Sequence, residues 1–288
     1  MWKVPLFDIS FDEKEHDAVK TVMDSGWLSM GEVTRKFENE FSEFLGVKHS
    51  IAVANATAAL HLANLALDLN EESEVVCPAL TFVASANSII YTGAKPVFAD
   101  IIDTNDFNIS PDDIESKITS MTRAIQVVHY AGYPCNMNRI MELARKYNLY
   151  VIEDSAHAHG AEYQGEKCGA IGDIGCFSFL TNKNMTTVEG GMVTTNNDEL
   201  AVKIRILRSQ GMTSLSLDRF KGHAFSYDVV ELGYNYRIDE IRSAIGIVQL
   251  DKLKHFNKKR KQLVQIYKQK LTGIKEASIP FDKNQENS

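Results

Sequence analysis

Residues 176–191 of this chain, CFSFLTNKNMTTVEGG, carry the features that decide the expected fold. Phe177-Ser178-Phe179 has the apolar, aromatic character of a buried strand. A short polar segment with Lys183 follows, and Gly190-Gly191 permits a tight reversal into a second strand. A lysine just beyond a core strand is commonly a solvated loop residue, but a desolvated amine there can form a Schiff base with an aldehyde. Taken alone, the stretch favours the solvated loop.

The composition of the chain excludes several classes of function. Its 288 residues are 44% hydrophobic and 24% charged, which is typical of a globular protein. The net charge of −7 argues against a general nucleic-acid-binding role, because neutralising phosphates requires a basic surface. Neither a membrane span nor a signal peptide is expected, since apolar runs are short and charges are scattered through the N-terminus. The four cysteines form no CxxC pair, so a reducing, cytoplasmic compartment is expected, without structural zinc or a disulfide framework.

Apolar strand-like runs alternate with helical runs on both sides of the central stretch. The expected strands include residues 50–54, 74–77, 96–100, 124–129 and 149–152, and the expected helices include 12–24, 32–45, 58–67, 82–91, 139–147, 198–208 and 239–271. This alternation predicts right-handed crossovers and an α/β fold with a mainly parallel sheet. In such sheets ligands gather at the carboxyl ends of the strands. The polar tail 282–288 is expected to be disordered.

Polar residues follow two of the expected strands. Asn55-Ala56-Thr57 joins a strand to a helix, where free backbone N–H groups can bind an anion, although Asn55 or Thr57 can also be a simple helix cap. Asp154 follows an apolar run, and His157 comes three residues later. An aspartate there is often a turn residue, but it can also keep a pyridine nitrogen protonated, which makes the ring an electron sink. A metal site at His157 and His159 is not expected, because no third ligand has suitable spacing.

Three further segments are singled out by their glycines. Gly169, Gly172 and Gly175 do not lead from a strand into a helix, so they fail the context of a dinucleotide-binding fingerprint. Residues 212–232 are polar and without periodicity, as in functional or mobile loops, and Gly233-Tyr234-Asn235-Tyr236-Arg237 follows them. A loop between Gly26 and Gly31 is expected to expose Trp27 and Leu28, as a packed turn, a lid or a subunit contact.

Five short motifs follow one another along the chain: Asn55-Ala56-Thr57, Thr81-Phe82, Glu153-Asp154-Ser155-Ala156-His157, Ser178 with Lys183 and Glu189-Gly190-Gly191, and Gly233-Tyr234-Asn235-Tyr236-Arg237. In this order they resemble the DegT/StrS family of pyridoxal-phosphate-dependent nucleotide-sugar aminotransferases, which have the fold-type-I architecture. The resemblance runs from about residue 5 to about residue 271. It implies a cofactor-binding α/β/α large domain over residues 1–240 and a long helix in residues 241–288 that leads into an incomplete C-terminal small domain.

The resemblance implies that three side chains act on pyridoxal 5′-phosphate. Lys183 is implied to form a Schiff base with its aldehyde, Asp154 to pair with its ring nitrogen, and His157 to contact its phenolic oxygen. Phe82 is implied to stack on the ring. The implied reaction is a ping-pong transamination from an amino donor, expected to be glutamate, to a keto-sugar of a nucleotide-sugar. Its product would serve surface polysaccharide or other amino-sugar biosynthesis.

The phosphate of the cofactor is implied to have its own set of contacts. Ala56, Thr57 and Ser178 match phosphate-binding positions of the family. Asn235 matches a residue that reaches the phosphate in the neighbouring subunit, so a homodimer with shared active sites is implied.

Two alternative functions stay open. Family dehydratases use the same cofactor but have a histidine in place of the lysine, so Lys183 argues against them. A non-catalytic cofactor-binding or regulatory protein is the other alternative, because family members continue beyond Leu271 into a small domain and this sequence stops soon after it.

Overall fold

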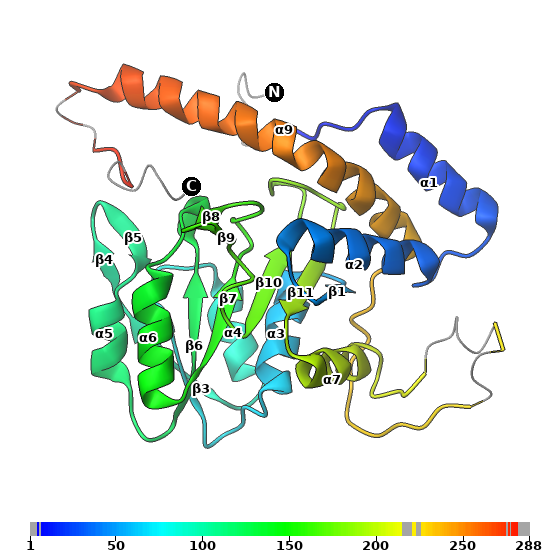
Figure 1. Cartoon of the computed structure of the whole chain (residues 1–288), viewed down its shortest axis with the longest axis horizontal. Helices are drawn as coiled ribbons and strands as arrows, with labels where there is room; N and C mark the ends of the chain where they lie inside the picture. The colour runs from blue at the N-terminus through cyan, green and yellow to red at the C-terminus, as the bar shows by residue number, and fades with distance from the viewer. Residues whose placement is uncertain are drawn as a thin grey trace.

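A seven-stranded sheet forms the centre of the molecule (Figure 1). The computed structural model describes residues 5, 7–214, 221–222, 226–274, 276 and 278–281. The sheet order is β1-β11-β10-β7-β6-β2-β3, and the strands are β1 (His49–Val53), β2 (Glu74–Pro78), β3 (Lys95–Ala99), β6 (Thr122–Val128), β7 (Tyr150–Asp154), β10 (Ile174–Ser178) and β11 (Gly191–Thr195). Strand β11 pairs antiparallel with β1 and β10, and the other pairings are parallel. The predicted α/β fold with a mainly parallel sheet is confirmed.

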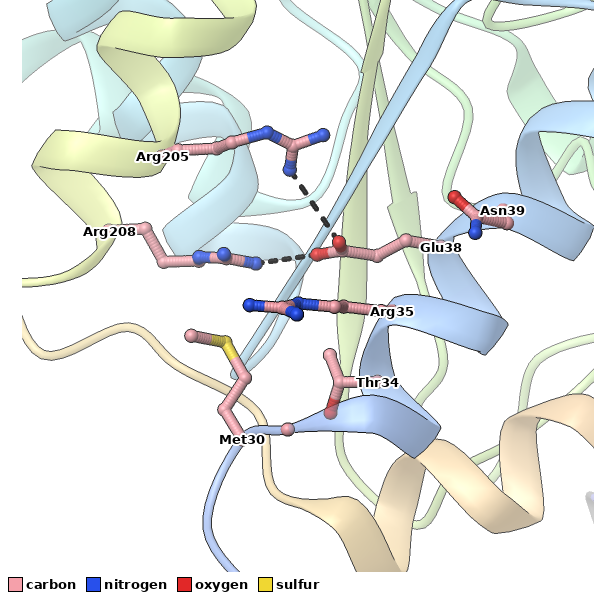
Figure 2. A pocket seen from close by; sticks show the side chains of 8 residues that line it. Met30, Thr34, Arg35, Glu38, Asn39, Arg205 and Arg208 are labelled. Atoms are coloured by element: carbon pink, nitrogen blue, oxygen red, sulfur yellow. Dashed lines mark hydrogen bonds and ion pairs between the residues drawn. The ribbon is translucent and has the colours of Figure 1, made fainter. Parts of the chain in front are cut away.

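The outer edge of β1 is covered by side chains from α2 (Glu32–Leu45) and α7 (Asp198–Arg208), as Figure 2 shows. The N–H of Ala52 donates to Glu38 Oε1 at 2.9 Å, and the Ala52 carbonyl accepts from Arg208 Nη1 at 2.8 Å. Arg208 also donates to Glu38 at 2.6 Å, and Arg205 lies 3.5 Å from the same carboxylate. This buried ion pair therefore satisfies backbone groups that the sheet itself leaves unpaired.

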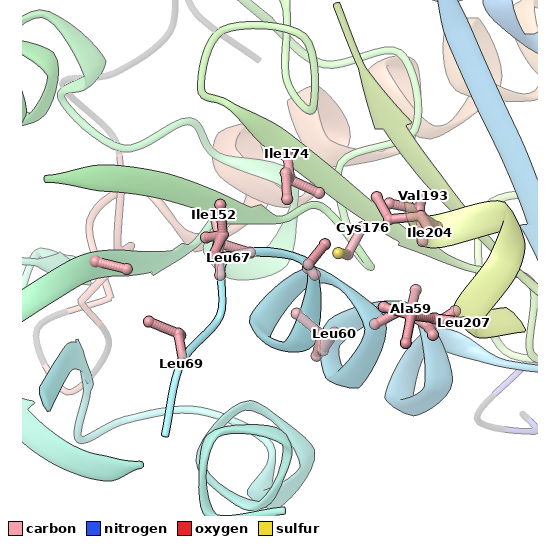
Figure 3. Packing of buried hydrophobic residues seen from close by; sticks show 14 of the residues in the cluster. Ala59, Leu60, Leu67, Leu69, Ile152, Ile174, Cys176, Val193, Ile204 and Leu207 are labelled. Atoms are coloured by element: carbon pink, nitrogen blue, oxygen red, sulfur yellow. The ribbon is translucent and has the colours of Figure 1, made fainter. Parts of the chain in front are cut away.

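Helices cover both faces of the sheet. On one face lie α3 (Ala56–Ala66), α4 (Val83–Ile90) and α7, and on the other lie α5 (Pro111–Lys117), α6 (Met137–Tyr147), α2 and α9 (Glu240–Leu271). Figure 3 shows α3 and α7 packing Leu60 and Leu207 against strand residues such as Ile174 and Val193. Neighbouring strand residues alternate between the faces: Cys176 joins the α3 side and Phe177 joins the α2 side.

The predicted helices are present, and most of their ends lie within two residues of the predicted ones. Helices α2 and α7 have the predicted bounds, and α2 is terminated by Gly46, whose φ of 82° suits glycine. Ser110 caps α5 ahead of a first-position proline. Helix α1 (Glu13–Ser25) has a capping box formed by Asp12 and Glu15. None of the helices in the described ranges is long and apolar enough to cross a membrane.

The 32-residue helix α9 packs its first half on α1 and α2 and then runs beyond them (Figure 1). Residues 261–267 are exposed. Two short hairpins went unpredicted: β4 (Ile101–Asp103) with β5 (Asp106–Ile109), and β8 (Glu162–Tyr163) with β9 (Glu166–Lys167). Their strands of two to four residues are too short to show a periodicity.

Two sequence expectations change or stay open. The expectation that Trp27 is exposed is wrong, because its side chain is half-buried against Gly31, whereas Leu28 is exposed. Within the irregular region 212–232, an isolated antiparallel bridge joins Met212 to Val229, and Thr213 N donates to the carbonyl of Asp228. The predicted disordered tail 282–288 lies outside the described residues, and the division at residue 240 stays a prediction.

Candidate active site

The carboxyl ends of β1, β7 and β10 bring most of the predicted site residues to one rim of the sheet. Gly191, the first residue of β11, pairs with Val53 at the end of β1 and with Ser178 at the end of β10. The turn that begins α3 and the hydroxyl of Ser178 therefore lie on either side of Gly191. On the other side of β10, Asp154 at the end of β7 pairs with Cys176.

The turn before α3 has the geometry of an anion cradle. Asn55 is the helix cap, and its Oδ1 accepts from Ala58 N at 2.8 Å. This bond leaves the N–H groups of Ala56 and Thr57, for which the described residues provide no acceptor. A Cβ on Gly191 would lie 2.6 Å from the carbonyl carbon of Asn55, so only glycine permits this close approach of β11. Free N–H groups at a helix N-terminus favour a phosphate.

Asp154 is a buried carboxylate held in a fixed orientation. Its side chain is only 6% exposed. Oδ2 accepts from Ser85 Oγ at 2.9 Å, and Oδ1 accepts from Ala156 N at 3.2 Å. Burial raises the pKa of Asp154, and the two hydrogen bonds together with the charges of His157 and Lys183 oppose that rise. A cation brought against this carboxylate would stabilise its ionised form.

Lys183 lies in the loop after β10, where its N–H donates to the carbonyl of Leu180 at 2.9 Å. The side chain is partly buried. Burial lowers the pKa of Lys183, and the charge of Asp154 acts in the opposite direction. A lowered pKa increases the neutral, nucleophilic fraction of the amine, so the structure favours the desolvated lysine over a solvated one.

The other predicted residues flank this pair. His157 has an exposed side chain, but it lies near enough to Asp154 and Lys183 for their charges to act on its pKa, which desolvation lowers overall. Phe82 precedes α4, one turn before Ser85, and is 74% exposed, so its ring face is available. Asn235 is exposed, and no described interaction links its side chain to the other site residues.

Comparison with known proteins identifies the group to which this arrangement belongs. The model of the DegT/DnrJ/EryC1/StrS aminotransferase family matches residues 10–288. The chain belongs to this family.

Relatives of this chain include proteins that are named as sugar aminotransferases. The chain is 45% identical to the GDP-perosamine synthase of Caulobacter vibrioides over 264 residues, which are 91% of this chain and 68% of that protein. It is similar to the Helicobacter pylori aminotransferase PseC, involved in the biosynthesis of pseudoaminic acid, with a TM-score of 0.86 and 35% identity over 93% of this chain and 71% of that one. It is also similar to the PLP form of the Streptococcus pneumoniae putative sugar aminotransferase Spr1654, with a TM-score of 0.86 and 30% identity over 94% and 72% of the two chains.

One buried residue beside the site, Glu153, was not predicted as part of it. Glu153 is fully buried beside Asp154 and accepts four hydrogen bonds. The donors are His129 Nε2 at 2.9 Å and the N–H groups of Gly169, Ile171 and Gly172 at 2.6–2.8 Å. Cys135 N donates to His129 Nδ1, which places the ring proton on Nε2. The carboxylate therefore joins the ends of β6 and β7 to the loop before β10.

Gly169 and Gly172, two of the three glycines that do not form a dinucleotide fingerprint, belong to this same loop, whereas Gly175 lies in β10. A Cβ on Gly172 would lie 2.8 Å from the carbonyl oxygen of Val151, and one on Gly169 would lie 2.3 Å from the ring of Phe177. The loop lies against β7 and β10 because these positions have no side chain. An acidic residue inside an apolar strand was the one sequence signal that pointed to the cage around Glu153.

Exchange of Glu153 for glutamine is expected to destabilise the cofactor-free protein by about 3 kcal/mol, because an amide NH2 would face donors that need an acceptor. Urea unfolding measures the change in the free energy of unfolding. The matched control is Glu166→Gln, which alters an exposed carboxylate in the nearby β9 and is expected to change stability by less than about 0.5 kcal/mol. Equal stability of the two variants would contradict the importance of the cage.

The cavity of Figure 2 lies apart from the predicted site. It has a volume of about 320 Å³ and contains none of the predicted site residues; it is lined by Met30, Gly31, Thr34, Arg35, Glu38, Asn39, Arg205 and Arg208. Its charged groups include the ion pair that covers the edge of β1. No group of three or more described His, Cys, Asp or Glu side chains is placed to bind a metal ion.

Proposed function

We propose that the chain is a pyridoxal-phosphate-dependent aminotransferase that transfers an amino group, with glutamate as donor, to a keto-sugar of a nucleotide-sugar. The observation that carries the proposal is the meeting of Lys183, Asp154 and the free N–H groups of α3 at one rim of the sheet. Family membership supports the reaction class. The names of the relatives support the sugar substrate, and the chain spans about 70% of their length.

The residues present fit the cofactor at three points. The N–H groups of Ala56 and Thr57, with the Ser178 hydroxyl nearby, suit its phosphate. Asp154 suits its protonated ring nitrogen, since a cation there relieves the cost of burying the carboxylate. Lys183 suits its aldehyde. When bound, the cofactor supplies an electron sink.

The side chains of the protein have the remaining tasks. The neutral amine of Lys183 takes the proton from the α-carbon of the amino donor, and the resulting ammonium later returns a proton. Asp154 stays ionised beside a cation, and Ser85 fixes the plane of its carboxylate. The exposed ring of Phe82, just before α4, is proposed to cover one face of the bound cofactor ring and so to exclude water from that face.

The proposed reaction divides into two halves that can be tested separately. Purified protein loaded with pyridoxal phosphate should convert glutamate to 2-oxoglutarate in an amount equal to the number of active sites. Addition of GDP- or UDP-linked keto-sugars should then give an amino-sugar nucleotide, detected by mass spectrometry. Cofactor binding without the glutamate half-reaction would favour a non-catalytic homologue and overturn the proposal.

The proposed working unit is a homodimer with shared sites. Segment 233–237 is fixed by backbone bonds, including Ala54 N to the Tyr236 carbonyl at 2.8 Å and Tyr234 N to the Leu207 carbonyl at 2.7 Å. The exposed Asn235 side chain is thus presented on a rigid segment. Exposed apolar residues on α4, including Val83 and Ile90, supply surface for a subunit contact beside the site.

Mixing inactive Lys183→Ala and Asn235→Ala chains is expected to restore about one quarter of the parental activity after random subunit exchange, because half of the dimers are hybrids with one complete site. Activity of the mixture is measured against each variant alone, with exchange verified by differently tagged subunits. No recovery after verified exchange, or activity in a monomer, would rule out the shared site.

A further inference from the structure

Helix α9 touches two segments of the site through one polar patch. Leu253, Asn257 and Arg260 recur at helical spacing, so they share one face of α9. Leu253 is buried in the core cluster of α2 and β10, whereas Asn257 and Arg260 are partly buried. The next seven residues are exposed, so Arg260 marks the end of the packed part of the helix.

The hydrogen bonds of this patch reach both loops that carry predicted catalytic residues. Arg260 Nη2 donates to the carbonyl of Asn184 at 3.0 Å, directly after Lys183. Asn257 Nδ2 donates to the carbonyl of His159 at 2.8 Å, two residues after His157. Asn257 Oδ1 accepts from Arg260 Nη1 at 3.0 Å and from Asn184 Nδ2 at 3.4 Å, which joins the two contacts.

The backbone beneath Asn257 leaves room for this contact. Gly160 has a φ of 80°, and a Cβ there would lie 3.2 Å from Asn257 Nδ2 and 3.4 Å from the ring of Phe44. A larger residue would be strained in this conformation and would crowd the amide. Arg260 donates from Nη1 and Nη2 to two uncharged oxygens. The contact therefore depends on the two forked donors of the guanidinium and not on an ion pair.

The lysine loop is anchored before Asn184 by Lys183 N, which donates to the carbonyl of Leu180 at 2.9 Å, and it is also anchored after Asn184. Thr187 N donates to the carbonyl of Phe179 at 3.0 Å, and Met185 is buried in the core. Asn184 itself is bonded to α9, since its carbonyl accepts from Arg260 and its side chain donates to Asn257. These contacts therefore fix the main chain next to Lys183, whose long side chain has no rigidity of its own.

We propose that Asn257 and Arg260 are positioning residues for the reaction, which clamp the Lys183 loop and the His157 loop to α9 at a set separation. Their role rests on the proposed function, because it is exerted through Lys183. A lysine amine must lie near its reacting carbon in a narrow range of geometry, and an error of about 1 Å can cost about a hundredfold in rate. The clamp supplies this precision from the backbone.

The test compares Arg260→Ala and Asn257→Ala with Lys261→Ala, which removes an exposed side chain from the next position of the same helix. Hydrogen exchange of the cofactor-free proteins is measured at the amides of residues 183–187. We expect about tenfold faster exchange in the two clamp variants and none of this change in Lys261→Ala. This arm needs no cofactor, so its result is independent of the proposed function.

A second arm examines the cofactor-loaded proteins. The pH midpoint of the visible absorbance of the bound cofactor is expected to shift in Arg260→Ala, and borohydride fixation on Lys183 should slow by about tenfold. Arg260→Lys, which keeps the charge and one donor, should lie between the parent and Arg260→Ala. If Arg260→Ala does not fold, Arg260→Lys takes its place in both arms of the test.

The outcomes separate the two proposals. Unchanged exchange at residues 183–187 in folded clamp variants would overturn the clamp. A lower melting temperature with an unchanged pH midpoint and fixation rate would also overturn it, since the contacts would then be structural only. If the parent binds no cofactor, the proposed function fails, and the exchange arm still decides the clamp.

Discussion

Replacement of Lys183 by alanine is expected to abolish amino transfer, lowering the rate by about four orders of magnitude or more, with the fold intact. The amine is both the attachment point for the cofactor aldehyde and the base that moves the α-proton, and alanine can do neither. The backbone bonds of the loop, including Lys183 N to the Leu180 carbonyl, do not involve the side chain. The melting temperature of the cofactor-free variant should therefore stay close to that of the parent.

The measurement joins activity to covalent labelling. In the parent, borohydride should fix one cofactor per chain on Lys183, and peptide mass spectrometry should locate it there. Asn182→Ala, an exposed change in the same loop, is the matched control and should keep both label and activity. A label on a different lysine, or amino transfer by the alanine variant, would show that Lys183 has no such role.

Asp154→Asn is expected to lower the rate by about a hundredfold or more while the cofactor still attaches to Lys183. A neutral amide cannot stabilise a protonated ring nitrogen, so the ring becomes a weaker electron sink. The amide oxygen can still accept from Ala156 N, and its NH2 can donate to the Ser85 hydroxyl, which can turn its own proton to Thr81, so the orientation is preserved. Turnover is measured with glutamate as donor, and attachment is followed by visible absorbance.

A measurement of stability provides a control for Asp154→Asn, because the direction of the expected change is known. Burial raises the pKa of Asp154 in the folded protein. The free energy of unfolding therefore falls as the pH rises from the ordinary aspartate pKa through the raised one. Asparagine removes this cost, so the cofactor-free variant should be at least as stable as the parent at neutral pH. Near-parental turnover in such a well-folded variant would mean that Asp154 only shapes the turn.

Much of the fold was predictable because its signals are local. The glycine after Leu45 and the capped start of α7 set helix ends that the structure reproduces. The meeting of Asp154 and Lys183 was predictable as well, since parallel strands bring their carboxyl ends to one rim.

The supporting groups around that rim were not predictable in the same way. Glu153 finds its backbone donors 16 to 19 residues away, in a loop without periodicity. Arg260 and Asn257 lie 76 and 98 residues from the carbonyls they bind. Such pairings depend on how the chain packs, so a single sequence contains no pattern that identifies them.

The side chains that cover the edge strand β1 affect whether two copies of the protein can pair their sheets. An edge strand normally offers a row of backbone groups on which a second chain can add a strand, which is a route to aggregation. At Ala52 both groups are already taken, by Glu38 and Arg208, and Ala54 N is taken by the carbonyl of Tyr236. At the opposite edge, β3 carries Lys95 and Pro96, a charge and a missing donor that discourage further strand addition. Both margins of the sheet thus carry features that disfavour intermolecular β-pairing and the aggregation that can follow from it.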